Sequence, residues 1–272
     1  MRPSLRRRLF PWYGRSGRAL PWRRTRDPYA VLVSEVMLQQ TQVARVLPAY
    51  GAFLRRFPTL AALARAPLAD VLRAWSGLGY NRRARDLYRI ARLHPQRLPT
   101  DPAALDALPG VGAYTAAAVA CFAGGRRIAF ADTNIRRVLG RALLGRVATE
   151  REAVALDAAL LPRAGADRWH HALMDLGATV CLSRAPRCAV CPIRTDCRAR
   201  GRVTPAPVRR QAPFATSDRR VRGRIVALLR ERDMSVRSLQ SELGDGRVPR
   251  LIEALAEDGL VERVGRLVRL PA

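Results

Sequence analysis

The sequence contains no lysine, few cysteines and no long apolar run. All 49 of its basic side chains are arginines, and only five of its 272 residues are cysteines. No stretch approaches the roughly 18 to 20 apolar residues that a membrane-spanning helix needs. The basic N-terminal segment lacks an apolar core followed by a cleavage site of small residues, so we expect no secretory signal. The sequence therefore predicts a cytoplasmic protein in a reducing compartment, without a membrane partner.

Acidic residues are also scarce. The chain has 22 aspartates and glutamates against 49 arginines, which gives a net charge of +27. A GC-rich genome would explain arginine in place of lysine, but not this excess of cations. Positive charge spread along a whole chain attracts a polyanion through phosphate contacts. The sequence therefore indicates a nucleic acid as the partner.

Strand patterns are almost absent before the C-terminus. Alanine and leucine recur at helical spacing between short breaks of proline and glycine, which predicts about ten short helices and an all-α body. Thr149 and Glu152 form a capping box at one helix start. Residues 201–216 are expected to be a linker. Residues 217–272 are expected to form three helices and a hairpin around Gly265, an order that resembles a winged-helix module.

Four of the five cysteines lie within seventeen residues, at the spacing C-x6-C-x2-C-x5-C. In a reducing compartment such a group binds metal more often than it forms disulfides. Four thiolates can hold either tetrahedral zinc or a [4Fe–4S] cluster, and both stay open on the residues alone. Cys121 lies apart in an apolar stretch and is expected to pack in the core. The predicted metal ligands are Cys181, Cys188, Cys191 and Cys197.

A tight turn separates two expected helices at "LPGVG". The second helix begins directly after the turn, so its free N–H groups and positive dipole end can bind a phosphate without reading a base. An ordinary corner between two helices is the structural alternative. The candidate phosphate-binding residues are Leu108, Gly110, Val111 and Gly112.

Two carboxylates stand in apolar surroundings. Residues 29–38 are apolar except at Ser34 and Glu35, so burial is expected to raise the pKa of Glu35. A protonated carboxyl can act as a general acid, whereas a carboxylate that faces solvent would need no function. Asp132 follows the apolar run "IAFA" and opens a helix, where it would serve as a cap.

Taken in order, five motifs resemble the adenine DNA glycosylases of the MutY type, in the helix–hairpin–helix glycosylase superfamily. They are "LPWRRTRDPYAVLVSEVMLQQTQV", "GLGYNRRARDL", "LPGVGAYTAAAV", "ADTNIRRVLGRAL" and the cysteine run, and the likeness covers about residues 8 to 200. The cysteine spacing is similar to the [4Fe–4S] signature of the endonuclease III-like members. The resemblance implies a cluster domain of residues 1–25 and 132–200 and a helical bundle of residues 26–131 that carries the hairpin. It also implies a monovalent cation at the hairpin.

The resemblance implies roles for single residues. Glu35 would protonate the adenine, and Asp132 would stabilise the oxocarbenium-like sugar with help from Tyr114 and Asn134. Members that also cut the strand carry a lysine where this chain has Tyr114, and without any lysine we expect base removal alone. The residues implied to line the base pocket or to fill the gap left by a flipped nucleotide are Trp22, Arg23, Gln40, Thr41, Leu78, Tyr80 and His171.

The chain departs from the family at several points. His171 stands where glutamate or glutamine is common, and Asn81 replaces the second tyrosine of "GLGYY". The family's C-terminal domain, which checks for 8-oxoguanine, is not evident. Residues 217–272 would replace that check or would only bind flanking duplex, and both alternatives stay open.

The expected function is therefore a monomeric, monofunctional glycosylase that excises adenine mispaired with 8-oxoguanine or guanine in base excision repair. One alternative is a related mismatch glycosylase that removes thymine or uracil opposite guanine. The other alternative is not an enzyme: an iron–sulfur winged-helix regulator that binds DNA.

Overall fold

The computed structural model describes residues 2–202 and 213–272, and helices dominate them. The chain divides into two compact units, named here for one carboxylate in each. The Asp132 unit comprises the described residues of Met1–Val31, Thr100–Asp106 and Val111–Arg209. The Glu35 unit comprises Leu32–Pro99, Ala107–Gly110 and the described residues of Arg210–Ala272. The all-α prediction for the body is confirmed.

The Asp132 unit is built around α11 (Ala166–Thr179), which packs against α1 (Arg2–Ser16) and α9 (Thr133–Leu144). Its other helices are α7 (Pro102–Asp106), α8 (Ala113–Phe122) and α10 (Glu150–Leu160), with short 3-10 turns at Pro21–Arg23, Cys188–Val190 and Arg194–Asp196. The predicted capping box is confirmed, because Thr149 and Glu152 bond reciprocally at the start of α10. Cys121 is fully buried in α8, as predicted.

The helical part of the Glu35 unit follows the chain from α2 to α6. Its helices are α2 (Pro28–Leu38), whose first turn belongs to the other unit, α3 (Val43–Arg56), α4 (Leu60–Arg65), α5 (Leu68–Ala74) and α6 (Arg82–Leu93). Their buried faces carry the core of the unit, where Phe53, Trp75 and Leu87 are fully enclosed. Among the described residues, no helix of either unit is long and apolar enough to cross a bilayer.

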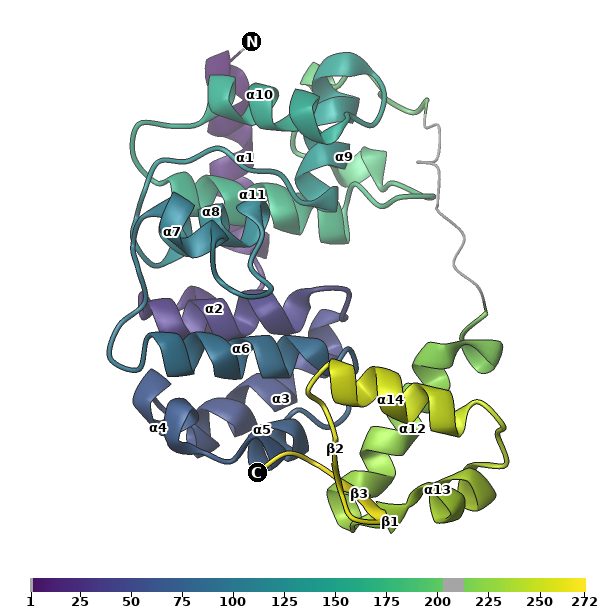
Figure 1. The fold of residues 1–272 in the computed structure, drawn as a ribbon. Coiled ribbons are helices and arrows are strands. Elements are labelled where there is room, and N and C mark those ends of the chain that lie inside the picture. Colours follow the sequence, from purple (N-terminus) through teal and green to yellow (C-terminus); the bar gives the residue numbers. More distant parts are fainter. Residues whose placement is uncertain (1, 203–212) are drawn as a thin grey trace. The chain divides into compact units, whose positions relative to one another are not determined.

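The C-terminal residues form a compact group of three helices and a small sheet, drawn in green to yellow (Figure 1). Its elements are a 3-10 turn at Phe214–Thr216, α12 (Asp218–Glu231), β1 (Met234–Ser235), α13 (Val236–Leu243), α14 (Val248–Glu257), β2 (Glu262–Val264) and β3 (Leu267–Arg269). The strands pair antiparallel in the order β1-β3-β2, with Met234 opposite Val268.

Three helices and a hairpin that turns at Gly265 are what the sequence predicts for this segment. The two-residue strand β1 was not predicted, because it is too short to show an alternating pattern. Residues 203–212 of the predicted linker lie outside the described residues. We call residues 213–272 the C-terminal module, and its identification as a winged helix stays a prediction.

Candidate active site

Glu35 lies in an almost wholly apolar helix. From Ala30 to Met37 every residue of α2 is buried, and Glu35 itself is only 8% exposed. Helix formation follows from this burial, since α2 is apolar except at Ser34 and Glu35. The Asp27 carboxylate accepts the Tyr29 N–H at 3.0 Å and caps its first turn. A carboxyl in such surroundings is poorly solvated when charged, which is the physical basis of the raised pKa predicted for Glu35.

The end of α2 is held by one buried arginine. Arg83 of α6 donates from Nη1 to the carbonyls of Val36, Met37 and Gln39, at 2.9, 2.9 and 2.6 Å. These carbonyls belong to the last turn of α2 and its exit, where helical partners run out. Burial lowers the pKa of Arg83 to about 10, which leaves it charged at neutral pH. Arg83 therefore fixes the C-terminal end of the helix that carries Glu35.

The second guanidinium nitrogen of Arg83 holds the loop between α5 and α6. It donates to the carbonyls of Leu78 and Gly79 at 3.2 and 3.1 Å and to the Thr41 hydroxyl at 3.0 Å. This loop is strained, since Tyr80 has a φ of 47° between the left-handed Gly79 and α6. Tyr80 is 43% exposed, whereas Leu78 is buried. Of the predicted wedge residues in this loop, only Tyr80 therefore reaches solvent.

Gln40 shares the left-handed conformation of Tyr80, with a φ of 54°, and its side chain is exposed. Asn and Asp tolerate this region better than other residues with a side chain, so Gln40 also stores backbone strain. The neighbouring Thr41 is tied to the loop by Arg83. The structure thus places Gln40, Thr41, Leu78 and Tyr80 around one buried guanidinium.

Asp132 caps α9 in the other unit, as the sequence predicts. Its Oδ1 accepts the Ile135 N–H at 2.7 Å, and its Oδ2 accepts the Asn134 side-chain amide at 2.7 Å. Burial raises the pKa of Asp132, although both of these hydrogen bonds act against the rise. The carboxylate is therefore held in one orientation, and its charged form is poorly solvated.

Arg137 continues this network toward the cysteine segment. It donates to the Asn134 side-chain oxygen Oδ1 at 2.7 Å, and to the backbone carbonyls of Gly177 and Cys181 at 2.6 Å each. The close approach of α9 to α11 requires glycine at 177, because a Cβ there would lie 2.5 Å from the Asn134 Cβ. A continuous chain of hydrogen bonds therefore joins Cys181 to Asp132.

The segment before Asp132 is fixed by a fully buried carboxylate. Asp157 accepts hydrogen bonds from the Trp169 indole at 2.7 Å and from the Phe130 N–H at 3.2 Å, and it pairs with His170 Nε2 at 2.8 Å. His170 also stacks on the Phe130 ring at 3.9 Å. Tyr114 of α8 meets Phe130 edge-on at 5.6 Å, so Tyr114 belongs to the surroundings of Asp132.

The four predicted cysteine ligands line one cavity. It is otherwise apolar, with Leu176, Val180 and Ile193 in its wall. Four cysteine sulfurs around one mostly apolar cavity are the donor set that a [4Fe–4S] cluster takes, so the residues present fit such a group.

Charge around this cavity favours bound thiolates. Arg141 donates to the Cys181 sulfur at 3.5 Å and to the carbonyls of Leu182 and Ser183 at 2.7 Å each. Burial raises the pKa of the Cys191 thiol to about 11. Ligation by iron would have to displace this proton, because the thiolate is the ligand.

The predicted base-pocket residues Trp22 and Arg23 lie in the turn before α2. Trp22 is buried, and Arg23 forms a bidentate ion pair with buried Asp175, at 2.7 and 2.8 Å. His171 stacks on Phe122 at 4.3 Å, and burial, followed by the charge of Arg23, lowers its pKa to about 3. His171 is therefore a neutral, packed imidazole at physiological pH.

The glycine turn before α8 has the local geometry that the sequence predicts. Gly110 has a φ of 71°, and α8 begins at Ala113 directly after its N-cap, Gly112. Leu108 and Val111 are buried and anchor the turn. A Cβ at Gly112 would meet nothing within 4 Å, so space is open beside the first turn of α8.

Comparison with known proteins places these features in a family. A model of the HhH-GPD superfamily of base excision DNA repair proteins matches residues 33–161, which include Glu35, the glycine turn and Asp132. An adenine DNA glycosylase of Mycobacterium tuberculosis is 44% identical over 271 residues, covering 94% of this chain and 89% of that protein. The chain belongs to the HhH-GPD superfamily.

Other similar proteins match a smaller part of the chain. The adenine DNA glycosylase of Homo sapiens is 40% identical over 218 residues, which cover 74% of this chain and 40% of that protein. A solved thermostable thymine-DNA glycosylase has a TM-score of 0.65 at 29% identity, covering 74% of this chain and 96% of that one. An endonuclease III captured as a covalent intermediate with DNA has a TM-score of 0.63 at 24% identity, which supports the fold.

Sequence reasoning missed the arginines and buried acids that position the HhH-GPD site. Arg83, Arg137, Asp157 and Asp175 each join segments that lie far apart in the chain. In a sequence with 49 arginines, the sequence alone does not indicate which of them are buried. Asp157 was concealed by the apolar pattern of α10, on whose buried face it lies.

Proposed function

We propose that the chain is a monofunctional adenine DNA glycosylase of base excision repair, acting on adenine mispaired with 8-oxoguanine or guanine in double-stranded DNA. The observation that carries the proposal is the 44% identity to an adenine DNA glycosylase over 94% of the chain. Buried Glu35 and half-buried Asp132 support it, because each is a carboxylate at a motif position that the resemblance assigns to catalysis.

In the proposed reaction Glu35 acts first. Its carboxyl, kept neutral by the apolar surface of α2, donates a proton to N7 of an extruded adenine. The protonated base leaves with the electrons of its bond to C1′. Asp132 then stabilises the positive charge on the sugar until water attacks C1′, and the hydrogen bonds from Ile135 and Asn134 hold its carboxylate in place. Tyr114 assists near the sugar.

The same reaction has no lyase step. A Schiff base with the opened sugar needs an amine, and position 114 carries tyrosine in a chain without lysine. The proposed product is therefore DNA with an abasic site and an intact backbone.

The cysteines Cys181, Cys188, Cys191 and Cys197 would hold a [4Fe–4S] cluster. Such a cluster would supply a rigid, charged anchor for its loop rather than a reacting group. Through Arg137, the backbone of Cys181 would support the position of Asp132. We assign a monovalent cation to the glycine turn at Gly110 and Gly112, and we expect a monomer that works on DNA in the cytoplasm.

DNA handling is assigned to the strained residues of the Glu35 unit. Tyr80 and Gln40 would fill the space of the flipped nucleotide, with Leu78 and Thr41 supporting them. Trp22, Arg23 and His171 would form the wall of the base pocket. A mismatch glycosylase acting on thymine opposite guanine is the second candidate, favoured by the likeness to the thymine-DNA glycosylase structure.

The test is a base-release assay on a panel of duplexes that carry A:8-oxoguanine, A:G, T:G or U:G. We expect release from the two adenine duplexes, an intact strand before alkali treatment, and loss of release in the Glu35→Gln variant. Release of thymine or uracil with adenine left in place would assign the second candidate. The third alternative, a regulator without catalysis, predicts no release from any duplex.

A further inference from the structure

The C-terminal module docks firmly on the helices that carry the Tyr80 loop. Arg230 of α12 donates to the Leu72 carbonyl at 3.0 Å, the Ser76 hydroxyl at 3.2 Å and the Asn81 side chain at 3.3 Å. At the other end of the module, the Ala69 N–H donates to the Pro271 carbonyl at 2.9 Å. The C-terminus of the chain accordingly lies beside α5 (Figure 1).

A buried carboxylate completes the docking. Asp258, directly after α14, pairs with Arg82 of α6 and with Arg222 of α12, and its carbonyl accepts a hydrogen bond from Arg85. Charge-assisted bonds to one buried carboxylate fix orientation as well as distance. The module and α6 therefore form one interface within the Glu35 unit.

This interface reaches the exposed wedge candidate. Arg219, in the first turn of α12, donates to the Tyr80 hydroxyl at 2.9 Å. Asn81, which departs from the family motif, accepts from Arg230. The departure at Asn81 thus has a physical reason, because the residue is a docking contact for the C-terminal module.

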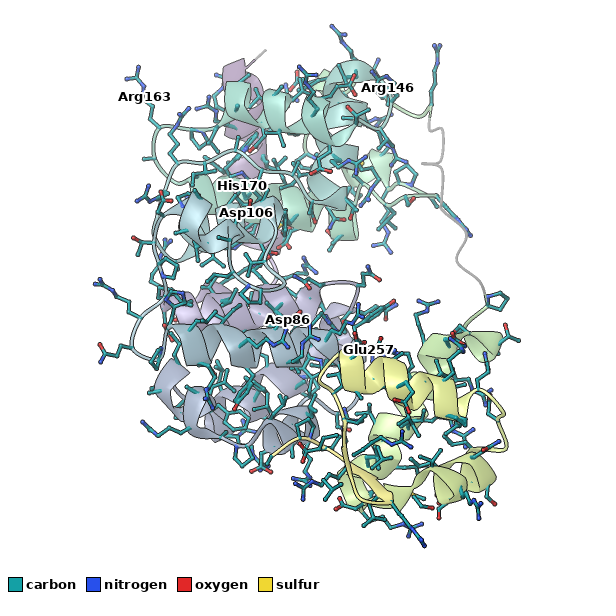
Figure 2. All side chains as sticks on the ribbon, in the orientation of Figure 1. Asp86, Asp106, Arg146, Arg163, His170 and Glu257 are labelled. Atoms are coloured by element: carbon teal, nitrogen blue, oxygen red, sulfur yellow. The ribbon has the colours of Figure 1, made fainter. Side chains whose placement is uncertain are left out.

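The third helix of the module is poorly suited to bind phosphate. In helix-turn-helix proteins the corresponding helix enters the major groove. Here the exposed side chains of α14 include Glu253, which pairs with Arg263 at 2.6 Å, and Glu257, labelled at the end of α14 in Figure 2. The basic side chain of α14, Arg250, is already paired with Asp218 at 2.9 Å, so this helix offers a DNA backbone no unpaired cation.

A polar pocket of about 180 Å³ lies instead between α12 and the end of α13. Arg220 and Arg224 line it, one helical turn apart, together with Gly244 and Asp245. The negative charge of Asp245 is already engaged, because Arg247 pairs with it at 2.8 Å. Arg224 makes no hydrogen bond or ion pair with any residue that the structure describes, so the pocket keeps a net positive charge.

The two pocket arginines face away from the docking interface. Arg219, Arg222 and Arg230 follow one face of α12, and Arg220 and Arg224 lie about a third of a turn around the helix from it. Both side chains are exposed. Paired guanidinium groups beside an open glycine backbone are suited to a phosphate, which they can bind with several N–H groups.

We propose that this pocket binds a backbone phosphate of duplex DNA, and that the docking contacts hold it in register with Tyr80. The second part rests on the proposed function, since it takes Tyr80 to be a DNA wedge. The module then extends the DNA footprint beyond the body. The match to the mycobacterial protein covers 94% of the chain and therefore includes most of the C-terminal module.

The test compares two full-length double variants that lose the same charge. In Arg220→Gln/Arg224→Gln the pocket loses both arginines, whereas Arg237→Gln/Arg266→Gln removes two exposed arginines elsewhere on the module. Binding to an undamaged duplex is measured by fluorescence anisotropy from 50 to 200 mM salt, with circular dichroism as the check on folding. An undamaged duplex keeps the result independent of base release.

Loss of one phosphate contact is expected to reduce the slope of log affinity against log salt by about 0.9. Between 50 and 200 mM salt the pocket variant should then lose about 3.5-fold less affinity than the wild type, and the control variant should follow the wild type. Equal slopes for the two variants would overturn the proposal. In that case calorimetry with inorganic phosphate would show whether the pocket serves a free anion instead.

If adenine release fails in the duplex panel but the slope still changes, the proposed function is wrong and the pocket remains. If adenine release occurs but the salt slope of the pocket variant does not change, the proposed function stands and the pocket proposal is wrong. A separate variant tests whether the pocket is held in a fixed position relative to Tyr80. The Tyr80→Phe variant, which loses only the hydroxyl contact with Arg219, should keep the salt slope and slow base release severalfold, and an unchanged release rate would contradict the register.

Discussion

The two candidate catalytic carboxylates are positioned by different means. Glu35 lies in a helix whose neighbours are apolar, and its position is set by backbone contacts that Arg83 makes to the end of α2. Asp132 sits in a polar network, where Ile135 and Asn134 donate to it and Arg137 orients Asn134. An apolar environment favours a neutral acid, whereas hydrogen-bond donors favour a charged acceptor. We expect a proton donor at Glu35. At Asp132 burial outweighs the two hydrogen bonds and raises the pKa, so the donors act by orienting the carboxylate.

Asp132→Asn should have the largest effect on activity. The asparagine can still cap α9, so the fold is kept while the negative charge beside the sugar is lost. Single-turnover adenine release is expected to fall about 1000-fold, in the range for electrostatic stabilisation of a transition state. Release within tenfold of the wild type would remove Asp132 from the mechanism.

The pH dependence of the stability of the same variant tests the raised pKa of Asp132. Because the folded-state pKa is raised, the stabilising contribution of Asp132 is present at acidic pH and is lost as pH rises through that pKa. The melting temperature of Asp132→Asn relative to the wild type should therefore increase from pH 4 to pH 7. A difference that stays constant over this range would contradict the raised pKa.

Arg83→Met should have the largest effect on stability. It leaves several buried carbonyls of α2 and of the Tyr80 loop without a donor, which we expect to cost about 3 kcal/mol. Urea unfolding measures this loss, and Arg89→Met, on an exposed position of the same helix, is the control. A loss as small as that of the control would mean that Arg83 does not hold these segments together.

Arg230→Met tests the docking of the C-terminal module. Three hydrogen bonds from a half-buried side chain are lost, for an expected cost of about 1 kcal/mol. Protection of the amides in α5 and α12 from hydrogen exchange should decrease, whereas Arg224→Met on the same helix should change neither region. Unchanged exchange in α12 would show that the module is held by other contacts.

The effect of His171→Gln on stability should appear only in acid. The depressed pKa of about 3 means that His171 stabilises the fold above its unfolded pKa and loses this contribution as pH falls toward 3. The wild type should therefore lose more stability than the variant between pH 7 and pH 4, measured by thermal unfolding. Parallel pH profiles would show that His171 titrates normally.

Much of the fold could be predicted, because it depends on local patterns. Helical spacing, the capping box at Thr149, the cap at Asp132 and the start of α8 after Gly112 are confirmed. The contact-based units place residues 111–131 with the cysteine-bearing segment, whereas the sequence grouped them with the helical bundle. Such a division depends on long-range packing, and the proposed domain boundaries stay a prediction.

The residues of the candidate site that belong to sequence motifs could be predicted, whereas the arginines that hold its segments together could not. Glu35, Asp132 and the four cysteines stand out by spacing and by their apolar neighbours. Arg83 and Arg137 act through carbonyl oxygens, which leave no trace in side-chain patterns. The docking role of Asn81 was likewise hidden, since its partner Arg230 lies 149 residues away in the chain.

The most direct test of the proton donor is the pH dependence of single-turnover adenine release from an A:8-oxoguanine duplex, for the wild type and for Glu35→Gln. A neutral Glu35 predicts a wild-type rate that falls as pH rises through a pKa above the usual range for glutamate. It also predicts a variant at least about 100-fold slower that lacks this fall. A variant that matches the wild type in rate and pH profile would contradict the assignment of Glu35 as the catalytic acid.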